Sequence, residues 1–304
     1  MLDEDYDTDE ERPEGEVLDA TYCSFIVARP TNDNKTVVIK QCRMRENRST
    51  PRRWRNEVEI LEIVAKSGHV RVQHSIHEQS HAKLHIVLTR ALSYQKNVTQ
   101  MLDNDPHELT ITLRHEPGLS LDRHIDDEKY CTLSSTDCHA IIAQIASALT
   151  FIHSRHIVHD DVRPENIMFA IEPRPHAVLI DFGASFNQAI LGRNYFILAG
   201  APLYVPPEFL QRRKGPEADI WGLGITTLYV MRELHLPENE FYLPTLFEDW
   251  ETKKEMEDWI DEVWEKVDEL GERGDDGLVR RMLDRDMYSR ITAEELMAAS
   301  MNGA

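Results

Sequence analysis

The sequence has little cysteine, no long apolar run and a deficit of basic residues. Its 304 residues include four cysteines, no two of which form a C-x-x-C pair, so neither a disulfide framework nor a zinc knuckle is indicated. No apolar run approaches the roughly 18 residues that a membrane-spanning helix needs, and the acidic N-terminal stretch is unlike a signal peptide. We therefore expect an intracellular chain, cytoplasmic or nuclear, with no membrane partner.

The deficit of basic residues gives the chain a formal net charge of −20, from 54 Asp and Glu against 34 Lys and Arg. Residues 1–16 carry −8 and residues 238–276 carry −12, so the remainder is neutral overall. Because an acidic chain repels a phosphate backbone, nucleic acid is not the expected partner. The first segment, 1–16, is poor in apolar residues and is expected to be a disordered acidic tail.

Two charged segments invite both a structural and a functional interpretation. The Arg43–Arg55 cluster holds six arginines opposed only by Glu46, and it is either a solvated helix entrance or a site for an acidic or phosphorylated segment. The acidic stretch 238–276 contains Trp250, Trp259 and Trp264. It is either an amphipathic helix whose tryptophans are core residues or a docking surface for a regulatory partner.

The N-terminal part of the chain has strand signals followed by a helix. Residues 36–39 form a β-branched run after a turn-rich segment, which predicts the second arm of a hairpin ending at Lys40. After Pro51 the apolar residues fall at helical spacing, and Glu57 shares their face while Glu59 and Glu62 point elsewhere. A carboxylate on a buried face needs a cation nearby.

The rest of the chain is predicted to be mainly helical. Residues 141–152 form an apolar stripe after a helix-start signal at 135–137, and two short strands, 167–169 and 177–180, flank a proline-rich turn. Helices are expected from about residue 217 onward. The last of them begins at a capping box formed by Thr292 and Glu295.

Residues 159–166 and 180–183 carry the chemistry. They place Asp161, Asn166 and Asp181 on loops between short strands. Phosphoryl transfer needs such a set, because the attacking hydroxyl needs a carboxylate to orient it and accept its proton, while Mg²⁺ needs hard oxygen ligands. Asp161 fits the first role, and Asn166 and Asp181 fit the second.

These motifs resemble those of the eukaryotic protein kinases, over residues 17–298. In the pattern of that family, Lys40 matches the strand lysine that holds the nucleotide phosphates, Glu57 matches its helix partner, and Arg163 stands where serine/threonine kinases usually have lysine. Three later features, Pro206-Pro207-Glu208, the run Asp219–Gly224 and Arg290, match the end of the activation segment, the helix that anchors the catalytic loop and the arginine that pairs with Glu208. Aminoglycoside- and choline-type kinases lack the arrangement of Glu208 with Arg290, so a protein substrate is favoured.

The resemblance implies an α+β bilobal fold. Its expected parts are an N-lobe at 17–113, a hinge at 114–119, a larger helical C-lobe at 120–298 and a C-terminal tail at 299–304. Leu113 would be the gatekeeper at the hinge. The rival strand at 84–88 would leave an unusually long gap before the helix at Ile141.

The resemblance also implies ATP and Mg²⁺ as cofactors. Asp161, Arg163, Lys40 and Glu57 would be catalytic, and Asn166 and Asp181 would bind metal. The residues around the nucleotide would be Ala20, Tyr22, Phe25, Val38, Lys40, Leu113, Glu116 and Met168.

Departures from the family pattern are equally specific. Leu18, Ala20 and Cys23 occupy the positions of the glycine-rich loop, where a side chain keeps backbone amides away from phosphates. Asp160 replaces the arginine that precedes the catalytic aspartate, so activation by phosphorylation at Ser185, Tyr195 or Tyr204 is not expected, and packing of Phe182 on His159 and Leu61 would hold the segment instead. Ala201 replaces a threonine typical of serine/threonine kinases.

Three functions are consistent with the sequence. The first is an active protein kinase acting on serine or threonine, the second is a pseudokinase that serves as a binding or scaffold module, and the third is a small-molecule kinase of the same fold. The histidines add little: His153, His156 and His159 recur every three residues with His159 assigned to the catalytic loop, while His74, His77, His81 and His85 are either a zinc site or a polar surface.

Overall fold

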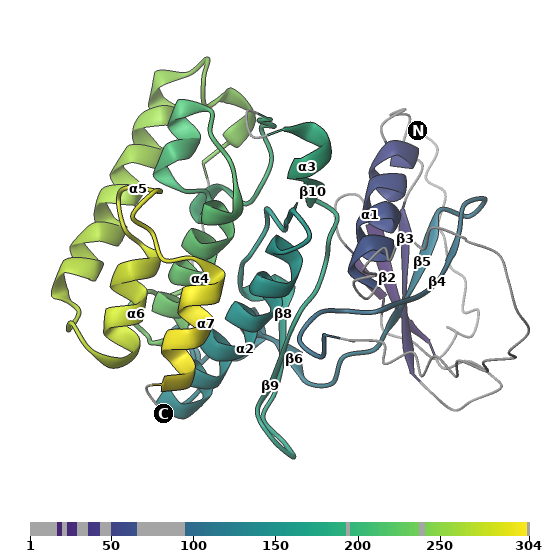
Figure 1. The fold of residues 1–304 in the computed structure, drawn as a ribbon, viewed down its shortest axis with the longest axis horizontal. Coiled ribbons are helices and arrows are strands. Elements are labelled where there is room, and N and C mark those ends of the chain that lie inside the picture. The colour runs from purple at the N-terminus through teal and green to yellow at the C-terminus, as the bar shows by residue number, and fades with distance from the viewer. Residues whose placement is uncertain are drawn as a thin grey trace, which may run out of the picture.

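A computed structural model describes residues 17–19, 23–28, 36–42, 50–65, 95–192, 195–236 and 241–302. Two lobes lie side by side along the long axis of the molecule, a small one built on a β-sheet and a larger helical one (Figure 1). The α+β bilobal fold expected from the sequence is confirmed. The expected tail at 1–16, the rival strand at 84–88 and the histidines 74–85 lie outside the described residues.

The small lobe contains a five-stranded antiparallel sheet in the order β1-β2-β3-β5-β4. Its strands are β1 (Val17–Asp19), β2 (Cys23–Ala28), β3 (Val37–Cys42), β4 (Met101–Asp105) and β5 (Thr110–Arg114). The hairpin of β2 and β3 confirms the prediction for residues 36–39. The strand continues past the expected end at Lys40, because Gln41 still pairs with Ser24 on one side and with Thr110 on the other.

Helix α1 (Thr50–Ala65) lies beside this sheet (Figure 1), and the face predicted to be buried is the buried one. Trp54, Glu57, Leu61 and Val64 are buried, whereas Glu59 and Glu62 are exposed. The Trp54 indole also donates to the carbonyl of Thr110 on β5 at 3.2 Å. The sequence periodicity therefore identified the buried side of the helix. Glu57 is the one buried carboxylate among the described residues of α1.

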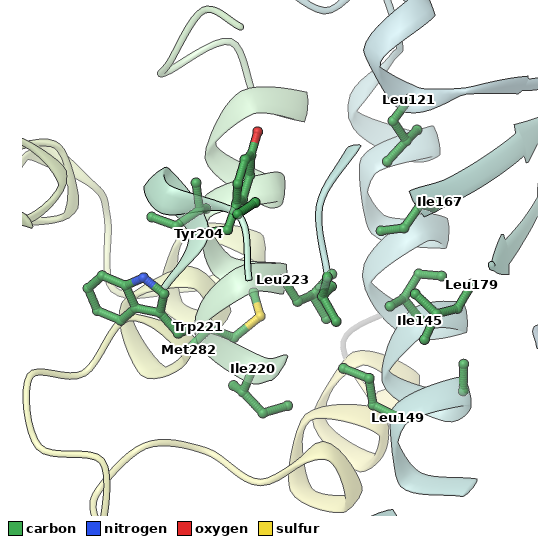
Figure 2. Packing of buried hydrophobic residues seen from close by; sticks show 14 of the residues in the cluster. Leu121, Ile145, Leu149, Ile167, Leu179, Tyr204, Ile220, Trp221, Leu223 and Met282 are labelled. Atoms are coloured by element: carbon green, nitrogen blue, oxygen red, sulfur yellow. The ribbon is translucent and has the colours of Figure 1, made fainter. Parts of the chain in front are cut away.

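The large lobe is built around two buried helices, α2 (Ser135–His153) and α4 (Pro216–Val230). Figure 2 shows Ile145 and Leu149 of α2, Leu223 of α4 and Leu179 within one continuous apolar cluster. Every residue of α4 from Ala218 to Val230 is buried. A helix that is buried all round is a rigid base from which a neighbouring loop can be held.

The remaining elements complete the large lobe. They are α3 (Gln188–Leu191), α5 (Trp250–Glu269), α6 (Gly274–Met282) and α7 (Ala293–Asn302), with a sheet in the order β6-β8-β9 (Leu119–Ser120, Ile167–Ala170, His176–Leu179) and the pair β7 with β10 (Ile157–Val158, Phe186–Asn187). Short 3₁₀ turns lie at Leu121–Arg123, Pro164–Asn166, Pro202–Tyr204, Pro207–Gln211 and Leu243–Thr245. The capping box of α7 is confirmed, since Thr292 Oγ1 accepts from the Glu295 amide at 3.2 Å and Glu295 Oε2 accepts from the Thr292 amide at 2.9 Å.

Of the two interpretations of the acidic stretch, the one in which its tryptophans are core residues does not hold for Trp250. This residue is 69% exposed, whereas Trp259 and Trp264 pack against the core and donate to the carbonyls of Leu203 and Leu283. Trp250 is the first residue of α5, and it lies off the buried stripe that the later apolar residues of this helix form.

The two lobes are also joined by hydrogen bonds outside the segment 114–119 that connects them along the chain. Asn97 O and Leu179 O accept from the amides of Leu179 and Thr99, both at 2.9 Å, so the segment before β4 is attached to β9. On the other side, the Asn56 side chain of α1 donates to Ser185 O at 2.8 Å. These contacts fix the distance between the sheet of one lobe and the loops of the other.

Candidate active site

Three charged side chains meet where the lobes face each other. Lys40 of β3 places its Nζ 2.8 Å from Glu57 Oε1 of α1 and 2.7 Å from Asp181 Oδ1, in the loop that follows β9. Lys40 and Glu57 are each 3% exposed. Three segments distant in sequence are thus held by one ammonium group, and Lys40 is the cation that the buried-face argument required for Glu57.

The two carboxylates respond differently to this environment. Burial raises the pKa of Glu57, and the charge of Lys40 only partly offsets it. Burial acts in the same direction on Asp181, but the charge and hydrogen bond of Lys40 and the amide of Gly183 together hold its pKa below the ordinary value. Asp181 is therefore an anion that remains available for a cation at neutral pH.

The loop around Asp181 is fixed by its own backbone and by Phe182. Asp181 adopts a left-handed conformation with φ 59°, and its Oδ1 accepts from the Gly183 amide at 3.0 Å. Phe182 is fully buried and meets the ring of His159 edge-on, with centroids 4.8 Å apart. His159 Nε2 in turn lies 3.0 Å from Ile180 O, so the loop is tied at both ends to residue 159.

Helix α4 anchors the loop at 159–166 through Asp219. Asp219, 1% exposed, accepts from the amides of His159 at 2.9 Å and Asp160 at 2.8 Å, and its Oδ2 also lies 2.8 Å from His153 Nε2. The recurrence of histidine at every third residue from His153 to His159 thus reflects separate structural contacts of His153 and His159. No group of three metal-binding side chains occurs among the residues that the structure describes.

Asp161 and Asn166 face each other across this loop. The Asn166 amide donates to Asp161 Oδ2 at 2.7 Å and to Asp161 O at 2.8 Å, and Arg163 Nε lies 3.6 Å from Asp161 Oδ1. The Asp161 side chain is 21% exposed, so it is held in place and is still accessible. Asn166 O accepts from the Ile180 amide at 2.9 Å, which brings the loop of Asp161 beside the loop of Asp181.

Elsewhere in the large lobe, Glu208 and Arg290 form a buried ion pair. Arg290 Nη1 lies 2.7 Å from Glu208 Oε1, and Arg290 Nη2 lies 3.0 Å from Glu208 Oε2. The predicted meeting of these two residues is confirmed.

The comparisons with known proteins agree with this geometry. A family model described as the protein kinase domain matches residues 21–301. The chain belongs to the protein kinase family. The kinase chain is 27% identical over 222 residues to the SNF1-like protein kinase ssp2 of Schizosaccharomyces pombe, covering 70% of this chain and 36% of that protein.

Two further relatives of the kinase chain are similar over comparable lengths. It is 32% identical over 206 residues to the serine/threonine-protein kinase ppk6 of Schizosaccharomyces pombe (66% of this chain, 23% of that protein). It is 27% identical over 217 residues to the human calcium/calmodulin-dependent protein kinase type 1B (70% of this chain, 60% of that protein). In each case the match covers less than two thirds of the relative.

The residues expected around the nucleotide are only partly described in the kinase chain. Ala20 and Tyr22 lie outside the described residues, and Phe25 is placed on β2 opposite Lys40. Val38 pairs with Leu113 across β3 and β5, while Met168 is half-buried on β8. Phe25, Val38 and Leu113 therefore lie on three adjacent strands of one sheet.

Glu116, in the expected hinge, makes a contact within its own segment. Arg114 Nε donates to Glu116 Oε1 at 2.9 Å, and Arg114 Nη2 donates to Oε2 at 3.1 Å. Burial raises the pKa of this carboxyl, and Arg114 opposes the rise. The Glu116 side chain is thus used to brace the segment that leads from β5 to the large lobe.

Sequence reasoning missed the partner of Asp160 in the kinase chain. The sequence shows only that Asp160 replaces the arginine of the phosphate-binding pocket; in the structure the Lys214 ammonium donates to Asp160 Oδ2, and the side chains of both residues are almost completely buried. The packing of Phe182 on His159 is present as well. A buried carboxylate needs a cation nearby, so the replacement of the arginine by Asp160 was the one signal in the sequence for a partner such as Lys214.

A small pocket lies beside Asp161 on the side of the activation segment. The residues that line it include Ala201, Tyr204 and Val205 together with Asp160, Asp161 and Lys214. In the kinase domain this pocket lies next to the carboxylate that the sequence assigns to the acceptor hydroxyl.

None of the described helices is long and apolar enough to cross a membrane.

Proposed function

We propose that this chain transfers the γ-phosphoryl group of ATP to a serine or threonine hydroxyl of a protein substrate. The observation that carries the proposal is the assembly of Lys40, Glu57 and Asp181 across both lobes beside the hydrogen-bonded pair of Asp161 and Asn166. The ion pairs that hold Lys40 and the hydrogen bond that holds Asp161 support this assignment. The names of the relatives support serine or threonine as the acceptor.

The donor set suits Mg²⁺. Asn166 supplies an amide oxygen, and Asp181 supplies a carboxylate whose pKa is held low, so both offer the hard oxygen ligands that this ion prefers. When bound, the ion would neutralise charge on the phosphates. Lys40 would contact the phosphates while Glu57 keeps the ammonium in place.

Asp161 would orient the acceptor hydroxyl and accept its proton. Asn166 fixes one carboxylate oxygen of Asp161 at 2.7 Å, which leaves the other side of the carboxylate towards Arg163 and solvent. A positioned carboxylate of this kind is what general-base catalysis requires. Arg163 would stabilise the charge on Asp161 before the proton is taken up.

The replaced glycines at Leu18, Ala20 and Cys23 favour a second candidate, a pseudokinase that acts as a binding module. A regulatory partner at the stretch 238–276 or at the Arg43–Arg55 cluster stays a prediction for either candidate. The third candidate, a small-molecule kinase, is disfavoured by the ion pair of Glu208 with Arg290.

The test is transfer of label from γ-labelled ATP with Mg²⁺ to casein or myelin basic protein, with Asp161→Asn as the matched control. Labelling by the wild-type chain that the control lacks would establish the activity. A melting temperature raised by Mg²⁺ and ATP without any labelling would favour the pseudokinase. Labelling of a small hydroxyl compound but of no protein would favour the small-molecule kinase.

A further inference from the structure

Lys214 connects three segments that determine the shape of the active site. Its Nζ donates to Asp160 Oδ2, in the residue next to Asp161, and to Ala199 O of the activation segment at 2.7 Å. The residue itself belongs to the loop that leads into α4. It is 4% exposed and lies over the ring of Phe209, with 5.2 Å from Nζ to the ring centroid.

Asp160 is itself held rigidly where it receives this contact. It adopts a left-handed backbone conformation with φ 66°, and its amide donates to Asp219 Oδ1 at 2.8 Å. The activation segment also approaches its carbonyl closely, since a Cβ added at Gly200 would lie 3.4 Å from Asp160 O. The contact of Lys214 with Asp160 therefore acts on two pieces of backbone that run close to each other.

The sign of the charges decides what this contact can recognise. An arginine before the catalytic aspartate can bind a phosphate, whereas the carboxyl group of Asp160 brings no positive charge to bind one. The Lys214 ammonium already has two buried acceptors, a carboxylate and a carbonyl. Ser185 is 2% exposed and its hydroxyl donates to His159 O at 3.0 Å, so this serine of the segment is also engaged in the fold.

We propose that Lys214 and Asp160 are a positioning pair that holds the activation segment, through Ala199, against the loop of Asp161 without any phosphate on the segment. The pair replaces the contact between an activating phosphate and an arginine. Here the carboxyl group is on the loop of Asp161, and the cation is the lysine before α4. This inference rests on the proposed kinase activity for its consequence, which is a kinase active in the unphosphorylated state. Its structural content is independent of that activity.

The first experiment compares Lys214→Met with Arg213→Met, a neighbouring cation that is exposed and donates to the Tyr288 hydroxyl at 3.2 Å. Amide hydrogen exchange over residues 195–205 should rise in Lys214→Met and stay at the wild-type rate in Arg213→Met. The turnover number on protein substrate should fall on the order of tenfold or more, with the KM for ATP changed less than about threefold, because a displaced segment misplaces the acceptor and not the nucleotide.

A second variant distinguishes a positioning role from a loss of folding. Adding Asp160→Asn to Lys214→Met removes the buried carboxylate that the single change leaves unpaired, so the double variant should melt at a higher temperature than Lys214→Met. It should nevertheless keep the raised exchange at 195–205, because Ala199 O still lacks its donor. Wild-type exchange in both variants would overturn the proposal.

The regulatory consequence is tested on the wild-type chain alone. After phosphatase treatment, verified as free of phosphate by intact mass, turnover should stay within about twofold of the untreated value. A large fall that rephosphorylation of Ser185 or Tyr195 restores would overturn the proposal. If the untreated chain transfers no phosphate at all, the proposed function fails, and the exchange measurement still decides on the pair.

Discussion

Arg290 and Glu208 are joined by two parallel hydrogen bonds, of 2.7 and 3.0 Å, across 82 residues of sequence. Both residues are buried, and the remaining donors of the guanidinium reach Asp284 O and Glu217 O. The arginine thus ties the end of the activation segment to the start of α4 and to the loop before α7.

Replacing Glu208 with alanine should destabilise the large lobe even without nucleotide. The change leaves Arg290 as a buried cation without its carboxylate, at an expected cost of about 3 kcal/mol or more in the free energy of unfolding. Thermal or urea unfolding measures this cost. The matched control is Glu257→Ala, whose exposed carboxylate pairs with Lys253 on the surface of α5 and should change stability little. Equal stability of the two variants would show that the Glu208 pair contributes nothing.

The ion pair of Glu57 could be predicted because sequence pattern and family motif agreed, whereas that of Glu208 with Arg290 was implied by the family resemblance alone. Helical periodicity placed Glu57 on a buried face, and a buried carboxylate needs a cation. The family motif then supplied Lys40 as its partner. The motifs placed Asp161, Asn166 and Asp181 on loops between short strands, and the hydrogen bonds from Asn166 to Asp161 and from the Ile180 amide to Asn166 O show that these loops are neighbours.

Gly183 should be sensitive to the smallest substitution, Gly183→Ala. An added Cβ would lie 3.0 Å from Asp181 Oδ1 and 3.3 Å from Lys40 Nζ, so the carboxylate or the ammonium must shift. Because both groups belong to the nucleotide and metal site of the proposed kinase, we expect transfer to fall on the order of tenfold and the Mg²⁺ requirement to rise. A magnesium titration of the labelling reaction measures both, and wild-type values would mean that the loop relaxes without consequence.

Asp161→Asn should retain nucleotide binding and lose transfer. The change removes a proton acceptor while leaving Lys40, Glu57 and Asp181 in contact. The shift of melting temperature with Mg²⁺ and ATP reports binding, and γ-label transfer reports chemistry. Asp127→Asn, at an exposed position, is the control and should behave as wild type. Labelling by Asp161→Asn at the wild-type rate would remove Asp161 from its assigned role.

What the sequence did not reveal depends on tertiary contacts without a local signature. The sequence shows Lys214 as the third of three consecutive basic residues, yet Arg213 is exposed and Lys214 is buried. Nothing in the spacing separates them, because the loop that carries them belongs to no periodic element. Trp250 is the converse case, since its residue type favours burial, but its place at the start of α5 leaves it in solvent.

The stability of the wild-type chain should decrease, relative to Asp160→Asn, as pH rises from about 4 to 7. Burial raises the pKa of Asp160 to about 7, with Asp219 and Asp161 adding to the rise and Lys214 only partly opposing it. In the unfolded chain this carboxyl titrates near its ordinary value of 3.8. Between these two values the folded chain keeps a proton that the unfolded chain has released, so each increase in pH favours unfolding. Asparagine cannot titrate, and the difference in unfolding free energy between the two chains therefore isolates Asp160 from the other carboxylates. Urea unfolding at a series of pH values measures it. A difference that stays constant across this range, or that grows in favour of the wild type, would show that Lys214 keeps the buried carboxylate ionised throughout.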